Sequence, residues 1–167
     1  MSAGCVVWLT GRPSSGKSTL ARAIFEKLRS RGRTACVLDG DSVRKVLVPA
    51  PGYSAEERQA FYATLANLAA LLADQGLIVL VPATAHQRGY RERARSLAAR
   101  FIEVYVDTAP EVATDRDSKG LYAGARAGEV KNLPGADVAY EPPRAADVHA
   151  RGGKDQSAVE QVLLLLG

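Results

Sequence analysis

The chain has few of the residues that build disulfide or metal frameworks. Its 167 residues include two cysteines, Cys5 and Cys36, and two histidines, His86 and His149. Both cysteines fall in apolar runs, which indicates buried free thiols in a reducing compartment, and two cysteines make no metal framework. The histidines are isolated, and we interpret them as surface loop residues rather than ligands. A disulfide-stapled or cysteine-metal fold is thereby excluded.

Long apolar runs and a strong net charge are also missing. No apolar stretch reaches membrane-spanning length, and Met1–Gly4 lead straight into the first predicted strand, so we expect no signal peptide. The net charge of +4 is mild, and a site for anionic ligands can account for much of it. We therefore expect a cytoplasmic protein without a nucleic-acid polymer or a membrane as partner. The length predicts one domain over residues 1–167.

What the sequence does contain is a phosphate-binding loop. The run from Gly11 to Ser18 matches the pattern G-x-x-x-x-G-K-[ST] without a gap. An apolar run over Cys5–Leu9 predicts a buried strand before it, and apolar spacing over Ser18–Arg29 predicts a helix after it. Backbone amides of such a loop cradle polyphosphate at the positive end of the helix. Lys17 is expected to contact the β- and γ-phosphates, and the Ser18 hydroxyl to join an Mg²⁺ shell.

Further strands and helices alternate along the chain. The long helix is predicted to open with a capping box formed by Ser54 and Glu57. The predicted strands are Thr34–Leu38, Leu77–Val81, Phe101–Val106 and a short fifth one over Asp137–Tyr140. The predicted helices are Ser54–Asp74, with Phe61, Leu65, Leu68, Leu71 and Leu72 on one face, then Tyr90–Arg100 and Val159–Leu166. This alternation predicts a three-layer α/β/α P-loop NTPase fold with a parallel sheet of about five strands.

Two carboxylates follow the second predicted strand. Asp39 and Asp41 flank Gly40 at a point where open α/β sheets gather their ligands. They are placed for a metal ion or for an acceptor hydroxyl, while the structural alternative is that Asp41 only caps the next helix. The arginines of the helix over 90–100 are interpreted as solvated charge.

The stretch over residues 116–135 is charged and punctuated by glycine. It follows the fourth predicted strand, which suggests a mobile lid that brings cations onto phosphates and excludes water. The structural alternative is a solvated helical hairpin.

Several segments together resemble the adenylylsulfate (APS) kinase family, whose members transfer the γ-phosphoryl group of ATP to the 3′-hydroxyl of adenosine 5′-phosphosulfate. The resemblance covers almost the whole chain, and the lid segment is more specific than the phosphate loop. The matching segments are Gly16–Thr19, Leu38–Arg44, Gly52–Ser54 with Arg58, Phe101–Asp107, Arg116–Tyr122, Ala125–Lys131 and Tyr140–Pro143.

The resemblance implies roles for individual residues. Its catalytic residues would be Lys17, Asp39, Asp41 and Lys119, with Asp41 as the proton acceptor and with Ser18 and Asp39 holding Mg²⁺. The ATP-binding residues would be Gly11, Arg12, Pro13, Ser14, Ser15, Gly16, Lys17, Ser18, Thr19 and Arg116. The acceptor-binding residues would be Asp41, Arg44, Tyr53, Arg58, Phe61, Lys119, Lys131 and Leu133, the arginines pairing with the phosphosulfate.

The chain departs from the family pattern on the acceptor side. Tyr53 and Leu133 replace the two phenylalanines that sandwich the acceptor's adenine in the family. Phe61 and Ala63 replace an asparagine and an arginine, and Ala85 replaces the serine of an Ile-Ser-Pro loop that aligns with residues 84–86. The donor half is thus conserved in pattern, whereas the acceptor half is rewritten.

Three functions remain open from the sequence. The leading one is phosphorylation of APS, with ATP and a small nucleotide acceptor as partners. A second is phosphorylation of another nucleotide-linked or small hydroxyl acceptor in a reshaped pocket. A third is a nucleotide-binding regulatory module without turnover. The family is commonly dimeric, so the resemblance also makes a homodimer one partner to test.

Overall fold

The computed structural model describes residues 3–108 and 138–167. The predicted lid over 116–135 lies outside the described residues. The described strands are β1 (Cys5–Thr10), β2 (Ala35–Val37), β3 (Ile78–Pro82), β4 (Phe101–Val106) and β5 (Val148–Ala150). The described helices are α1 (Lys17–Ser30), α2 (Gly40–Val46), α3 (Ala55–Asp74), α4 (Arg88–Leu97) and α7 (Gln156–Leu166). All four strand pairings are parallel, in the order β2-β3-β1-β4-β5, which confirms the predicted sheet.

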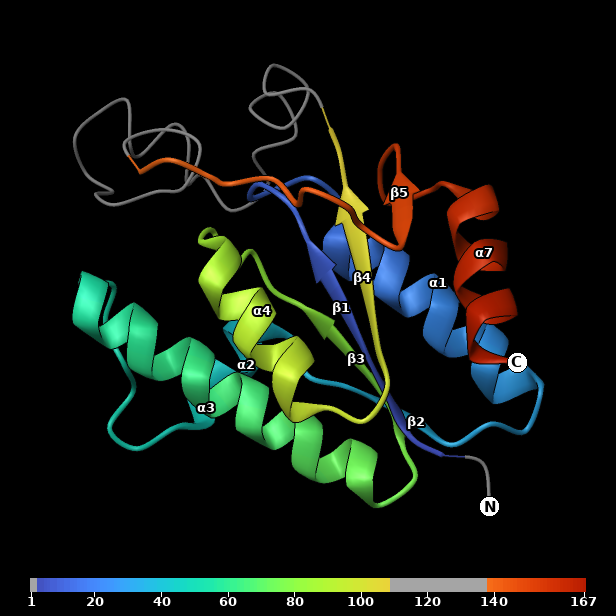
Figure 1. The fold of residues 1–167 in the computed structure, drawn as a ribbon, viewed down its shortest axis with the longest axis horizontal. Coiled ribbons are helices and arrows are strands. Elements are labelled where there is room, and N and C mark those ends of the chain that lie inside the picture. The colour runs from blue at the N-terminus through green and yellow to red at the C-terminus, as the bar shows by residue number, and fades with distance from the viewer. Residues whose placement is uncertain (1–2, 109–137) are drawn as a thin grey trace.

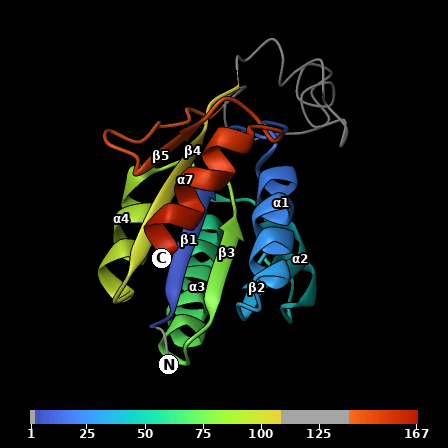
Figure 2. The same ribbon diagram turned by 90° about the vertical axis from the view of Figure 1, so that its right-hand side faces the viewer.

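Two helical layers cover the sheet, with α1 and α7 on one face and α3 and α4 on the other (Figures 1 and 2). Side chains alternate across β1 because successive residues of a strand point to opposite faces. Val7 and Leu9 belong to the core shared with α1 and α7, whereas Val6 and Trp8 belong to the core shared with α3 and α4. Both faces of the central strands are therefore apolar, as the continuous apolar runs predicted.

The parallel register brings the carboxyl ends of the strands to one edge. Leu9 pairs with Pro82 and Thr10 with Tyr105, so β1, β3 and β4 end together. The phosphate loop follows β1 at this edge, Asp39 follows β2, and the loop over residues 83–86 follows β3. This edge is where ligands bind in open α/β sheets.

The described helices confirm the predicted ones with shifts of a few residues at their ends. Ser54 caps α3 through the predicted capping box, in which its hydroxyl accepts from the Glu57 amide and the Glu57 carboxylate accepts from the Ser54 amide. The predicted apolar face of α3 was wrong at Leu71, whose side chain is exposed. Small residues, Ala66, Ala69 and Ala73, are buried instead because they allow close packing against the sheet. None of the described helices is long and apolar enough to cross a membrane.

Two other predictions were wrong. The fifth strand is Val148–Ala150, not Asp137–Tyr140; of the described residues 138–140, Val138 forms only an isolated bridge. After Tyr140 the backbone pairs with the loop that follows β3 and not with a strand, since the Glu141 amide donates to the His86 carbonyl. The arginines of α4 are not all solvated, because Arg91 is 2% exposed and pairs with Glu103 of β4.

Candidate active site

The loop between β1 and α1 has the backbone geometry of a phosphate cradle. Gly16 adopts φ 102°, a left-handed conformation that L-residues with a side chain rarely take. Gly11 lies so close to β4 that a Cβ there would stand 2.5 Å from the Val106 carbonyl oxygen. Both glycines of the motif are therefore required by the path of the chain.

The amino end of α1 is electropositive and open. An α-helix leaves its first amides without partners inside the helix, and among the described residues no side chain caps this end and no acid lies in its first turn. The Lys17 ammonium lies over the loop, where it donates to the Gly11 and Arg12 carbonyls at 3.1 and 2.8 Å. This arrangement presents fixed positive charge to an anion.

A second pair of glycines supports the loop from behind, and the sequence analysis missed it. Gly153 packs directly on the loop: a Cβ on Gly153 would stand 2.8 Å from the Gly16 carbonyl oxygen, and one on Gly16 would stand 2.5 Å from the Gly153 amide nitrogen. The sequence contains this pair as Gly152-Gly153, two residues after β5. Because the fifth strand was predicted at Asp137–Tyr140, the pair was not recognised as a turn at the end of a strand. Thr108 adds a second support, since its buried hydroxyl donates to the Ser15 carbonyl at 2.8 Å.

The loop is joined to the segment after β2 that carries the two carboxylates. The Ser18 hydroxyl donates to Asp39 Oδ2 at 2.8 Å, while Asp39 Oδ1 accepts from the Ser42 amide at 3.1 Å. Asp39, not Asp41, is therefore the cap of α2, which contradicts the capping alternative for Asp41. Asp41 lies in the first turn of α2 and is exposed. The Asp39 carboxylate thus accepts hydrogen bonds from both the phosphate loop and α2, whereas Asp41 is exposed one residue beyond Gly40.

The two acceptor-side arginines are buried beside aromatic rings. Arg44 is 9% exposed and Arg58 is 7% exposed. The Arg44 guanidinium carbon lies 4.1 Å from the Phe61 ring centre and 4.4 Å from that of Tyr53, and the corresponding Arg58–Tyr53 distance is 5.7 Å. Arg44 also donates to the Gly52 carbonyl at 2.8 Å. Tyr53 is itself half exposed, and it is the ring that both arginines share.

His86 is buried, so its interpretation as a surface residue was wrong. It is 4% exposed and packs against Tyr62 and Tyr90 at ring distances of 6.5 and 5.5 Å. Burial lowers the pKa of His86, and the positive charge of Arg58 lowers it further, so the ring is neutral at pH 7. Its Nδ1 has no hydrogen-bond partner among the described residues. His149 is exposed as expected, but it lies on β5 and pairs with Asp107 at 3.0 Å.

The other predicted site residues lie outside the described residues: Arg116, Lys119, Lys131 and Leu133. Of the remaining ones, Pro13 and Ser14 lie in the phosphate loop, Thr19 lies in the first turn of α1, Ala63 lies on α3, and Ala85 lies after β3.

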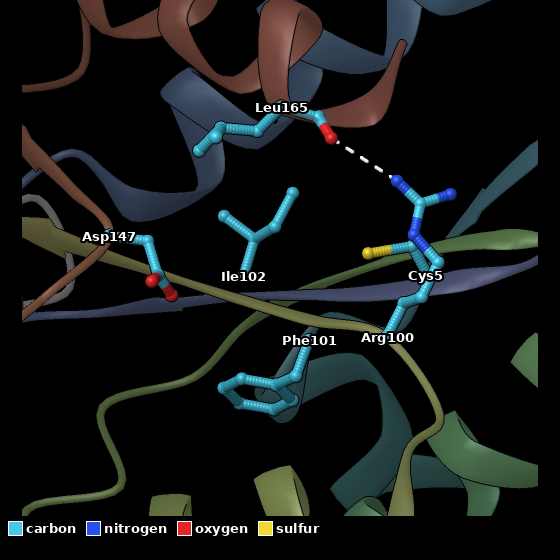
Figure 3. Close-up of a pocket in the computed structure, with 6 residues that line it drawn as sticks. All are labelled: Cys5, Arg100, Phe101, Ile102, Asp147 and Leu165. Atoms are coloured by element: carbon cyan, nitrogen blue, oxygen red, sulfur yellow. Dashed lines mark hydrogen bonds between the residues drawn. The ribbon is translucent and has the colours of Figure 1, made fainter.

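An open pocket of about 260 Å³ lies away from this site. Figure 3 shows its lining at the amino ends of β1 and β4, where Arg100 donates to the Leu165 carbonyl at 3.1 Å. Cys5 lines it, but burial raises the pKa of the Cys5 thiol, which therefore stays protonated at neutral pH. The phosphate loop is at the opposite ends of the same strands.

Comparison with known proteins identifies the family. The sequence pattern described as adenylylsulphate kinase matches residues 3–151. The adenylyl-sulfate kinase of Klebsiella pneumoniae (strain 342) is 43% identical over 166 residues, which cover 98% of this chain and 83% of that protein. The chain belongs to the adenylylsulphate kinase family. The corresponding protein of Enterobacter sp. (strain 638) is 42% identical over the same shares.

Solved structures agree with this family. The Mycobacterium tuberculosis APS kinase, solved in complex with AMPPNP and APS, has a TM-score of 0.92 and 39% identity, with full coverage of both chains. A gluconokinase from Sinorhizobium meliloti has a TM-score of 0.61 at 20% identity over 99% of this chain and 92% of that one, which shows a shared fold alone. The chain is a P-loop kinase of the adenylylsulphate kinase family.

The contact between Gly16 and Gly153 gives a test of the phosphate loop. We expect Gly153→Ala to push the loop out of position, because a backbone carbonyl cannot move aside as a flexible side chain can. A hydrogen bond to a charged group is worth about 1.5–3 kcal/mol, so losing one loop amide from the phosphates should raise the dissociation constant for AMPPNP by one to two orders of magnitude in calorimetry. Gly89→Ala is the matched control, since a Cβ there meets nothing within 4 Å and alanine favours a helix. Equal AMPPNP affinity in both variants would contradict this account of the loop.

Proposed function

We propose that the chain transfers the γ-phosphoryl group of ATP to the 3′-hydroxyl of adenosine 5′-phosphosulfate, giving 3′-phosphoadenosine 5′-phosphosulfate. The observation that carries the proposal is the pair of buried arginines, Arg44 and Arg58, that share the Tyr53 ring. Membership of the family supplies the reaction class. We place this reaction in the cytoplasm, where ATP is available and where free thiols such as Cys5 and Cys36 persist.

The donor half of the reaction depends on electrostatics and position. Phosphoryl transfer asks little covalent chemistry of the protein, so catalysis comes from holding the γ-phosphoryl group and stabilising its charge. The positive end of the α1 dipole and the Lys17 ammonium supply that charge from fixed positions. The hydrogen bond from Ser18 to Asp39 aligns the helix with the end of β2.

Mg²⁺ fits the oxygens at this point. Mg²⁺ is bound through one or two carboxylates together with substrate phosphates and water. Ser18 Oγ and Asp39 Oδ2 lie 2.8 Å apart and would hold the ion between the loop and β2. When bound, the ion neutralises charge on the β- and γ-phosphates.

The acceptor half depends on Asp41 and the two arginines. Asp41 is proposed to orient the 3′-hydroxyl and accept its proton, because it is exposed in the first turn of α2, at the edge where the strands end. The guanidinium groups of Arg44 and Arg58 are proposed to bind the phosphosulfate, whose paired oxygens suit a planar fork of donors. Lys119, Lys131, Arg116 and Leu133 keep the roles that the family resemblance implies as proposals.

The direct test is an ADP-release assay with ATP, Mg²⁺ and a panel of hydroxyl acceptors that includes APS. We expect APS-dependent ADP release, and a loss of about 10²–10³-fold in Lys17→Ala, because removing one fixed charge-stabilising group typically costs that much. Lys27→Ala is the matched control, since Lys27 lies in the last turn of the same helix. ADP release by Lys17→Ala at the wild-type rate would refute the phosphate-loop assignment. A homodimer stays a prediction, which light scattering of the purified chain measures.

The proton acceptor is tested by Asp41→Asn, which preserves size and removes the charge. General-base catalysis contributes about 10²–10⁴-fold, so kcat should fall within that range while ATP affinity stays the same. Asp74→Asn, at the exposed end of α3, controls for the loss of a surface charge. If Asp41→Asn only lowers thermal stability, its carboxylate merely interacts with the amino end of α2, worth about 0.3–1 kcal/mol.

The second candidate is a kinase for a different hydroxyl acceptor. The observation that favours it is Phe61, which stands where the family pattern has an asparagine and packs under Arg44 at 4.1 Å. The Phe61 ring holds the Arg44 guanidinium in position, but the pocket then lacks the amide that an asparagine at this position would supply. The two candidates therefore differ in the acceptor that binds beside Tyr53, Arg44 and Phe61: APS in the first, and another hydroxyl compound in the second.

Phe61→Leu separates the two candidates. Loss of a cation–π contact costs about 0.5–2 kcal/mol, so the KM for APS should rise by about two- to thirty-fold while the KM for ATP stays the same. Phe101→Leu is the matched control, because its ring lies under the Arg95 guanidinium at 4.8 Å on another part of the surface. If Phe61→Leu or Phe61→Asn lowers the KM for APS, Phe61 works against APS, and the second candidate takes over.

A further inference from the structure

A buried cluster of polar groups lies directly beneath the phosphate loop. Its centre is Thr10, the last residue of β1, whose side chain is fully buried. Thr10 Oγ1 lies 2.6 Å from the Thr84 carbonyl oxygen, 2.9 Å from the Tyr140 hydroxyl and 3.4 Å from Arg91 Nη1. We call Thr10, Arg91 and Tyr140 the buried hub.

The proton positions in the buried hub follow from counting donors and acceptors. The Thr10 hydroxyl has one proton, and the Thr84 carbonyl can only accept, so that proton goes to Thr84. Tyr140 must then donate to Thr10, and Arg91 donates as well. Burial raises the pKa of Tyr140 to about 12, which keeps this donor protonated at neutral pH. The Thr10 hydroxyl thus donates to Thr84 and accepts from Tyr140 and Arg91, and the Tyr140 hydroxyl donates to Thr10.

Arg91 extends the buried hub to two further segments. Its Nη1 donates to the Ala85 carbonyl and its Nη2 to the Glu141 carbonyl, both at 2.6 Å, while its Nε pairs with Glu103 at 3.1 Å. Ala85 adopts φ 43°, in the left-handed region where alanine is strained. The guanidinium therefore holds a strained loop in place, and Glu103 neutralises the charge that this requires.

Each connected segment supports a part of the candidate site. Thr10 precedes the phosphate loop, and the Arg12 guanidinium lies over the Tyr140 ring at 5.3 Å. In the loop over residues 83–86, Ala83 lies against Gly40, between the two carboxylates, and His86 packs on Tyr62, next to Phe61. The Glu141 amide donates to the His86 carbonyl at 2.8 Å, which joins the third segment to this loop.

We propose that Arg91 and Tyr140 are positioning residues that hold the donor side and the acceptor side of the site in register. The inference rests on the proposed kinase function. Its physical basis is two hydrogen bonds with assigned donors. Tyr140 donates to Thr10, the residue before the phosphate loop, and Arg91 donates to the Ala85 carbonyl in the loop over residues 83–86. Phosphoryl transfer needs in-line alignment, and misplacement on the order of 1 Å costs about 10²-fold in rate.

The test uses Tyr140→Phe, which removes one hydroxyl and keeps the ring under Arg12. We expect kcat with APS to fall about ten-fold or more, while the dissociation constant for AMPPNP changes less than about two-fold. Ser96→Ala is the control, because it also removes one hydroxyl, which donates to the Arg93 carbonyl at 2.7 Å on the exposed side of α4, outside the buried hub. Wild-type kcat at 25 °C in folded Tyr140→Phe would overturn the proposal, whatever its melting temperature, since a merely structural role changes only stability.

Arg91→Lys tests the second positioning residue. It retains a positive charge beside Glu103, but one ammonium cannot reach the two carbonyls and the carboxylate that the planar guanidinium spans. We expect a loss of kcat of about 10–100-fold. Arg95→Lys is the matched control, one turn further along α4, where Arg95 pairs with Asp147 at 2.8 Å. If Arg91→Lys fails to fold, Tyr140→Phe decides the question alone.

A readout without substrate separates this inference from the proposed function. If the wild-type protein releases no ADP with APS, the proposed function fails, and amide chemical shifts of Tyr140→Phe test the buried hub. We expect the Gly11 and Ala85 amide signals to shift together, because Thr10 Oγ1, which loses the Tyr140 donor, also contacts the Thr84 carbonyl and the Arg91 guanidinium that binds Ala85. An unchanged Gly11 signal would overturn the inference.

Discussion

The candidate site at the carboxyl ends of the strands depends on one close backbone contact, between Gly16 and Gly153. A Cβ on either residue would stand less than 3 Å from backbone atoms of the other, so the contact exists only because both lack a side chain. It seats the turn after β5 against the point where the phosphate loop becomes α1. The left-handed conformation of Gly16 and the position of the amino end of α1 are thereby fixed before any ligand binds. Preorganised donors of this kind lose little free energy to reorganisation when charge develops on a phosphoryl group.

The acceptor side is organised by a different principle. Arg44 and Arg58 are both buried, and burying a cation is costly unless other groups compensate. Arg44 is compensated by the ring faces of Phe61 and Tyr53 and by the Gly52 carbonyl. The aromatic substitutions that appear in the sequence as lost acceptor contacts therefore have a second role, because they hold the arginine. A sequence comparison alone shows that an asparagine is missing at position 61, but it does not show that the Phe61 ring packs against the Arg44 guanidinium.

Local signals in the sequence predicted what short-range physics determines. The Ser54–Glu57 capping box and the strand at Phe101–Val106 were located correctly because caps and alternating apolar residues act over a few positions. The fifth strand was not, because Val148–Ala150 is three residues long and is defined by pairing with β4, to which no local pattern points. The burial of His86 was missed for the same reason, since the two tyrosines that pack on it come from α3 and α4.

Arg91 shows most clearly where the sequence stops being informative. Arginine on a charged, amphipathic helix is solvated in most proteins, and only the position of Glu103 on the strand beneath makes burial tolerable. Burial of this ion pair is weak evidence for stability, because its Coulomb attraction is offset by desolvation of both groups. Burial raises the pKa of Glu103, while the charge of Arg91 lowers it. Two apolar side chains could fill the same space, but they could not donate to the Ala85 and Glu141 carbonyls. The guanidinium is therefore better explained by the backbone geometry that it fixes than by any stability that it adds.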